Sequence, residues 1–126
     1  MMPFVLLTAS ALMCRMSPTE CRSDDARTIA HAIDATTDDP GLRAHLVVYS
    51  YHESHWRLHP EPASWDALAG VAHGFLQLWG RAGLKTPEDQ CRVWLWLVQR
   101  GGLAALDSSP RRAARRAARA ARLLAE

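Results

Sequence analysis

The sequence predicts a mainly α-helical domain, and three observations carry this prediction. Apolar residues recur at helical spacing in four separate segments. A residue of the kind that caps helices precedes each segment, and in three of the four a proline follows the cap. The length of 126 residues, with 48% hydrophobic and 22% charged residues, fits one folded domain rather than two.

Residues 1–22 leave two interpretations open. The apolar stretch from Pro3 to Leu7, followed by Ala9-Ser10-Ala11, has the small-residue pattern of a signal cleavage site and is typical of a secretory leader. No Lys or Arg precedes the stretch, which instead favours a first helix packed on the core. No apolar run approaches the roughly 20 residues that span a bilayer, so we expect no transmembrane helix.

The cysteine pattern excludes one kind of site and leaves the redox state open. Cys14, Cys21 and Cys91 are an odd number without a CxxC pair, so a structural zinc site of the usual spacing is not expected. One disulfide with one free thiol and a fully reduced chain remain alternatives, and the sequence does not choose the pairing.

Two helices are expected before the middle of the chain. Ser23 and the two aspartates that follow it cap a helix over residues 23–36, because a hydroxyl and acidic groups satisfy the first backbone N–H groups. Asp39 before Pro40 repeats the start signal and predicts a second helix over residues 39–54.

The middle of the chain is less regular. Residues 55–69 contain prolines without sustained periodicity and predict a loop or a short irregular hairpin that lines a cleft. The apolar run over residues 75–79 is expected to form a short helix. Thr86 and Pro87, followed by two acidic residues, begin a further helix that ends at Gly101–Gly102 and places Trp94 in the core.

The last helix is expected over residues 109–125, after Ser109 and Pro110. Its arginines occupy one arc and its alanines the other, and these arginines are Arg111, Arg112, Arg115, Arg116, Arg119 and Arg122. Residues 108–126 carry six arginines against one glutamate, a net charge of +5, whereas the rest of the chain is net −3. We expect the arginine face to be solvated, with contact to an anionic polymer as the alternative.

Glu53 is the candidate catalytic residue. It follows an almost wholly apolar and aromatic segment, residues 46–52, at the point where a helix gives way to a loop. Burial beside aromatic groups disfavours the ionised form of a carboxyl group. Cleavage of a glycosidic bond needs a carboxyl that is still protonated near neutral pH, so the sequence predicts Glu53 as a general acid.

Three short motifs together resemble a known family. They are Tyr51-His52-Glu53-Ser54-His55-Trp56, Ala63-Ser64 and Ala72-His73-Gly74-Phe75-Leu76-Gln77-Leu78. The combination resembles lytic transglycosylases, including the soluble murein enzymes, and goose-type lysozymes of the lysozyme-like superfamily, over about residues 42–106. For residues 23–126 the resemblance implies a lysozyme-like α+β fold with four to six helices and a short loop or hairpin beside a cleft.

The resemblance also implies an activity on peptidoglycan. Glu53 is then the general acid and later base at the β-1,4 bond between N-acetylmuramic acid and N-acetylglucosamine, at the floor of the cleft. The residues implied to surround the substrate are Ser54, Trp56, Ser64, Asp66, Gly74 and Gln77. A hydrolytic lysozyme needs a second carboxylate, for which Asp66 is the candidate, whereas a lytic transglycosylase needs none. We favour the second route.

The same resemblance implies a monomer that acts outside the cytoplasm, whether periplasmic, secreted or delivered by a phage, without a cofactor. A catalytic metal is not expected, because His52 and His55 are three residues apart and Pro60 interrupts any helix that would hold His59. At least one of Trp56, Trp65 and Trp79 is expected to line the sugar site.

Two departures from the family pattern favour a different interpretation. The family's Tyr-Asn pair falls on Leu106-Asp107, and its first motif glycine falls on Val71. A catalytically degenerate module that binds glycan or a protein partner is therefore the first alternative. A helical nucleic-acid-binding protein, whose affinity would fall steeply with salt, is the second, and no sequence-specific nucleic acid is expected.

Overall fold

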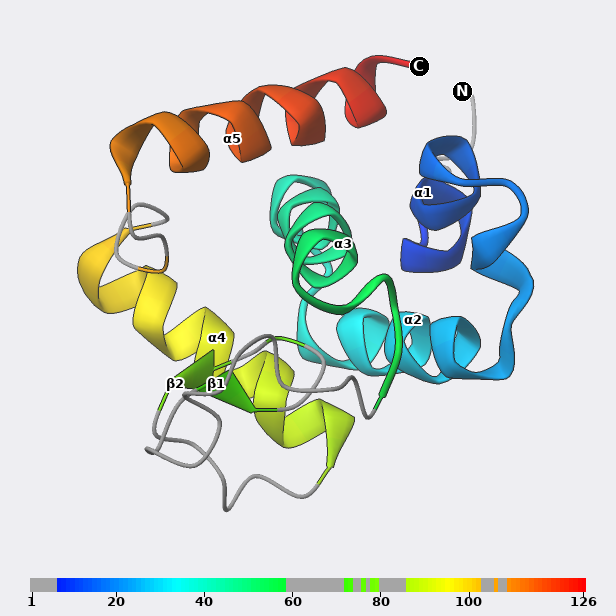
Figure 1. Ribbon diagram of the computed structural model, residues 1–126, viewed down its shortest axis with the longest axis horizontal. Coiled ribbons are helices and arrows are strands. Elements are labelled where there is room, and N and C mark those ends of the chain that lie inside the picture. The colour runs from blue at the N-terminus through cyan, green and yellow to red at the C-terminus, as the bar shows by residue number, and fades with distance from the viewer. Residues whose placement is uncertain are drawn as a thin grey trace, which may run out of the picture.

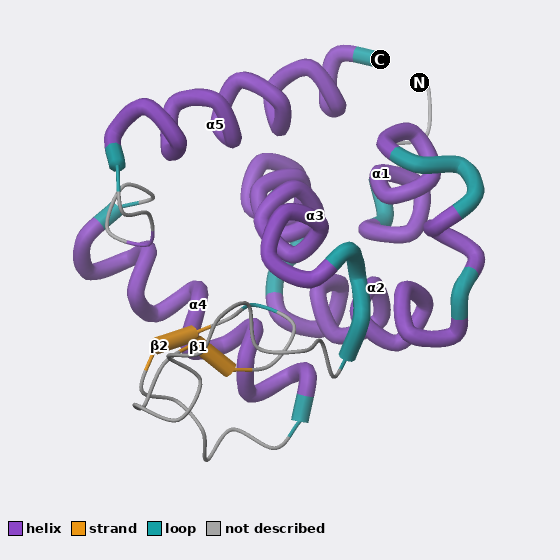
Figure 2. Tube along the Cα trace, in the orientation of Figure 1, coloured by secondary structure: helices purple, strands orange, loops and turns teal. Residues whose placement is uncertain are grey.

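The computed structural model describes residues 7–58, 72–73, 76, 78–79, 86–102, 106 and 109–126. The elements in this part of the chain are α1 (Ala9–Met16), the 3-10 helix η1 (Glu20–Arg22), α2 (Asp24–Thr36), α3 (Pro40–Ser54), β1 (Ala72–His73), β2 (Leu78–Trp79), α4 (Pro87–Gly101) and α5 (Pro110–Ala125). The mainly α-helical class is confirmed. Figure 1 shows α3 at the centre, with α1, α2 and α5 around it, and Figure 2 shows how little of the described chain is strand.

The predicted helix starts are confirmed at the level of individual hydrogen bonds. The side-chain oxygens of the four predicted caps, Ser23, Asp39, Thr86 and Ser109, each accept from the backbone N–H three residues further on. α1 begins in the same way, because Thr8 accepts from the N–H of Ala11. α4 ends where expected, and Gly102 after it has a φ of +77°, which a residue without a side chain adopts readily.

The prediction of a short helix over residues 75–79 is wrong at its end. Leu78 and Trp79 form β2, which pairs antiparallel with β1, with Ala72 opposite Trp79 and His73 opposite Leu78. A run of five apolar residues fits a strand as well as a helix, and periodicity cannot separate the two at this length. Here pairing with β1 makes Leu78 and Trp79 a strand, because each strand satisfies the other's backbone N–H and C=O groups.

α3 is the buried centre of the described fold. Leu46, Val47 and Val48 are fully buried, and Tyr49 and Ser50 continue the run. An α-helix buries five consecutive residues only when neighbours cover it on every side, since successive side chains point about 100° apart. α5, α1 and α2 all pack against α3 and supply this cover.

The N-terminal part of the described chain is joined by a disulfide. Ala9, Leu12 and Met13 of α1 are fully buried, and Cys14 is bonded to Cys21 of η1. Of the cysteine arrangements that the sequence left open, the structure therefore has this one. Cys91 lies free in α4, and burial raises the pKa of its thiol to about 12.

No helix among the described residues combines the length and apolarity needed to cross a bilayer.

Three helices meet at one buried guanidinium, that of Arg43 in α3, which is 3% exposed. Its nitrogens donate to the backbone oxygens of Thr37 at 2.7 Å, Leu7 at 3.1 Å and Asp34 at 3.3 Å. Its Nε lies 3.1 Å from the carboxylate of Asp34, which also accepts from the N–H of Ala9 at 2.9 Å. Arg43 and Asp34 thus hold the start of α1, the end of α2 and the first turns of α3 together.

We expect the substitution Arg43→Met to lower the free energy of unfolding by about 3–5 kcal/mol, because it leaves the Asp34 carboxylate without its cation and three carbonyl groups without a donor. Urea unfolding followed by circular dichroism measures the change. Arg27→Met, at an exposed position of α2, is the matched control and should shift stability by less than about 0.5 kcal/mol. A loss for Arg43→Met as small as that of the control would contradict this role.

Candidate functional site

Glu53, the predicted catalytic acid, lies in the last turn of α3 and faces α5. Its Oε1 accepts a hydrogen bond from Arg116 at 2.9 Å, across 63 residues of sequence. The Glu53 side chain is 22% exposed and that of Arg116 is 9% exposed. The carboxylate is therefore partly exposed rather than fully buried, and most of the predicted cleft loop lies outside the described residues. This pair joins the end of α3 to α5.

Arg116 is itself held in a fixed position. Its guanidinium lies over the ring of Tyr49, 4.7 Å from the ring centre, and the Tyr49 hydroxyl donates to the backbone oxygen of Leu106 at 3.1 Å. Tyr49 is one turn before Glu53 on the same face of α3. The aromatic face, the guanidinium and the carboxylate consequently form a continuous contact that joins α3 to α5.

A positively charged hollow lies beside this pair. It has a volume of about 450 Å³ and is formed by α5 and the end of α3, with the lining residues His52, Arg112, Arg115, Arg116, Ala118, Arg119 and Arg122. The apolar side of α5 is turned inward, where Ala120 and Leu123 are buried. The prediction of a solvated arginine face is thus right for the exposed arginines and wrong for Arg116, which is buried.

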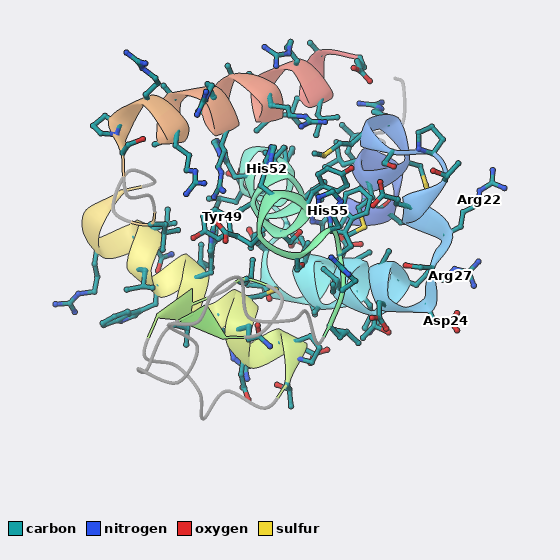
Figure 3. All side chains as sticks on the ribbon, in the orientation of Figure 1. Arg22, Asp24, Arg27, Tyr49, His52 and His55 are labelled. Atoms are coloured by element: carbon teal, nitrogen blue, oxygen red, sulfur yellow. A yellow bond between two sulfur atoms is a disulfide. The ribbon has the colours of Figure 1, made fainter. Side chains whose placement is uncertain are left out.

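His52 marks the α3 side of the hollow, and Figure 3 shows its side chain on the side of α3 toward α5. Its Nε2 lies 3.3 Å from a guanidinium nitrogen of Arg119. Desolvation lowers the pKa of His52, and the positive charges of Arg116 and Arg119 lower it further, since each disfavours the protonated ring.

A second polar cluster joins the end of α3 to η1. Glu20 accepts hydrogen bonds from the Tyr51 hydroxyl at 2.9 Å and the Ser17 hydroxyl at 3.2 Å, and its other oxygen lies 3.4 Å from Nδ1 of His55. The bond from Tyr51 is the main cause that lowers the pKa of Glu20. His55 adopts a left-handed conformation with φ of 52° and ends α3, so this cluster fixes the direction in which the chain leaves the helix.

Two other predicted site residues belong to the core. Ser54 is buried and its hydroxyl donates to the backbone oxygen of Ser50 at 2.9 Å, as serine often does inside a helix. Trp56 is 1% exposed and its Nε1 donates to the backbone oxygen of Val47 at 3.1 Å. A ring this buried offers no face to a sugar, so the expectation that Trp56 contacts substrate is wrong. Trp94 is buried as expected.

The remaining predicted contacts lie outside the described residues. These are Ser64, Asp66, Gly74 and Gln77, together with Trp65 and the side chain of Trp79. Of the predicted site residues, only Glu53, Ser54 and Trp56 lie in the described part of the chain, and all three are at or just after the end of α3. Within the described part of the chain, no group of three or more His, Cys, Asp or Glu side chains is placed to hold a metal ion.

The sequence-based reasoning missed Arg116 and Tyr49. Arg116 precedes the buried residues Ala120 and Leu123 by four and seven positions, so all three share one face of α5. This spacing was the available signal that Arg116 points inward, and the alternation of arginine and alanine hides it. Comparison with known protein families, with curated proteins and with solved structures found no match.

The lowered pKa of His52 predicts a pH dependence of stability. Because the folded state releases the His52 proton at a lower pH than the ordinary value of 6.5, the unfolded chain binds more protons just below that pH. The free energy of unfolding should therefore decrease as pH falls from about 6.5 through the lowered pKa. His52→Gln should make this decrease shallower in urea unfolding followed from about pH 7 to about pH 5. Identical pH profiles for the two proteins would show that His52 has no part in it.

Proposed function

We propose that the chain is a peptidoglycan-cleaving domain of the lysozyme-like class, in which Glu53 is the general acid and base. The observation that carries the proposal is the position of this carboxylate. It is partly exposed at the end of the central helix and is held by a guanidinium from the last helix. An acid–base group must be fixed within hydrogen-bond reach of the reacting oxygen, and fixation of this kind supports the role.

Arg116 is assigned a positioning role in this proposal. When Glu53 donates its proton to the leaving oxygen of the glycosidic bond, it becomes a carboxylate, and the Arg116 guanidinium at 2.9 Å stabilises that charge. The carboxylate then accepts a proton from the hydroxyl of the same muramic acid residue that attacks its anomeric carbon. The products are an anhydro sugar and a new chain end, and Glu53 is again protonated. No second carboxylate is required on this route.

The disulfide supports a location outside the cytoplasm. Disulfides such as Cys14–Cys21 form and persist in oxidising compartments and are rare where thiols are kept reduced. A peptidoglycan-directed protein meets its substrate in such a compartment. The bond and the proposed substrate therefore agree.

The second candidate is a glycan-binding module without turnover, and two observations favour it. Glu53 is engaged with Arg116, so one of its oxygens already has a guanidinium donor within the protein. Leu106 stands where the resembling family has a tyrosine, and the structure uses its backbone oxygen as the acceptor of the Tyr49 hydroxyl. Position 106 therefore has no tyrosine hydroxyl to offer to a substrate.

Incubation of purified sacculi with the wild type and with Glu53→Gln separates the candidates. We expect anhydro-muropeptides from the wild type and a loss of about 100-fold or more in their release by the variant, because an amide cannot donate the proton. Gln at position 53 keeps an acceptor for Arg116, so the fold should persist. Mass analysis of the products gives the readout. Glu88→Gln, the same chemical change in the first turn of α4, is the control and should keep full activity.

Other outcomes have defined meanings. Reducing ends in place of anhydro products would indicate a hydrolase. Equal release by Glu53→Gln would remove Glu53 from its role. If the wild type releases nothing but sediments with sacculi, the enzymatic proposal is wrong and the glycan-binding module is supported.

A further inference from the structure

The hollow formed by α5 and His52 carries a charge that the described protein leaves largely uncompensated. Five of its lining residues are arginines. Arg116 pairs with Glu53, whereas no carboxylate of the described residues lies within ion-pair distance of the other four. Like charges that line one hollow repel one another, and a bound anion relieves this repulsion.

The arginines are also arranged in a row. Arg112, Arg115, Arg119 and Arg122 recur at intervals of three and four residues, so they follow one side of α5. At 1.5 Å per residue the row extends over about 15 Å. Guanidinium groups at successive helical turns are suited to a chain with an anion at every repeat, not to a single small ion.

The chemistry of the row favours phosphate groups. A guanidinium presents a planar fork of donors that matches two phosphate oxygens, and arginine is less strongly hydrated than lysine. All the cations in this hollow are arginine. His52 lies among them, with its Nε2 3.3 Å from a guanidinium nitrogen of Arg119.

A bilayer surface fits this site less well than a linear chain. Helices that lie in a membrane interface bury an apolar face in lipid. The apolar face of α5 is already used inside the protein, where Ala120 and Leu123 are buried. The arginines instead line a concave space of about 450 Å³.

We propose that the hollow formed by α5 and His52 binds successive phosphate groups of a linear polyanion. The polymer lies along α5, with the exposed side chains of Arg112, Arg115 and Arg122 each bound to a phosphate and with Arg119 and His52 at the wall. This binding is separate from the chemistry proposed for Glu53 and does not depend on it.

Binding of linear inorganic polyphosphate by the whole chain tests the site, with calorimetry at several salt concentrations. We expect polyphosphate to bind far more tightly than inorganic phosphate, because several arginines act on one chain. The triple variant Arg112→Gln/Arg115→Gln/Arg122→Gln should lose about tenfold or more in affinity, and its salt slope should fall by about 2. These side chains are exposed, so the variant should fold, which circular dichroism checks.

The matched control is Arg22→Gln/Arg27→Gln/Arg111→Gln, which removes the same charge from exposed positions outside the hollow. Figure 3 shows Arg22 and Arg27 on the far side of α1 and α2 from α5, pointing into solvent. This variant should bind polyphosphate as the wild type does.

Three results would overturn the proposal. An equal loss in the control variant would show that only net charge matters. Equal affinity for inorganic phosphate and polyphosphate would show a single-ion site rather than a row. Binding to phosphatidylglycerol vesicles in the absence of any binding to polyphosphate would identify a lipid surface as the ligand.

Discussion

The described fold depends on the buried guanidinium of Arg43 and its partly buried partner Asp34. A charge that is 3% exposed is tolerated only when its donors are satisfied, and here three backbone oxygens and the carboxylates of Asp34 and Asp38 do this. These acceptors come from the chain before α1, the end of α2 and the loop before α3. These directional hydrogen bonds fix the positions of α1, α2 and α3 relative to one another. Apolar side chains pack around α3 within that arrangement.

The helices were largely predictable, because their start signals are local. Ser23, Asp39, Thr86 and Ser109 each act within three residues, so the sequence contains the complete interaction. Arg43 was not predictable, since its partners lie up to 36 residues away and nothing near it marks it as buried. The two short strands were not predicted for a related reason, because each forms its backbone pairing with the other.

The candidate site shows the same limit. The position of Glu53 at the end of a helix follows from the aromatic and apolar segment before it, and it was predicted. Its partner Arg116 was not, because the pairing depends on how α5 crosses α3, which no local pattern determines. Trp56 was misjudged because it follows the helix in sequence, as a loop residue would. Its left-handed conformation, with φ of 56°, turns the ring back under α3.

The separation of 63 residues between Glu53 and Arg116 also has a consequence for the order of folding. During synthesis α3 emerges long before α5, so its carboxylate and Tyr49 spend that interval without the guanidinium that later covers them. Contacts this distant in sequence form late because closing the intervening chain costs entropy. The central helix thus exists well before the last helix, and the surface that carries its carboxylate is completed only when α5 docks.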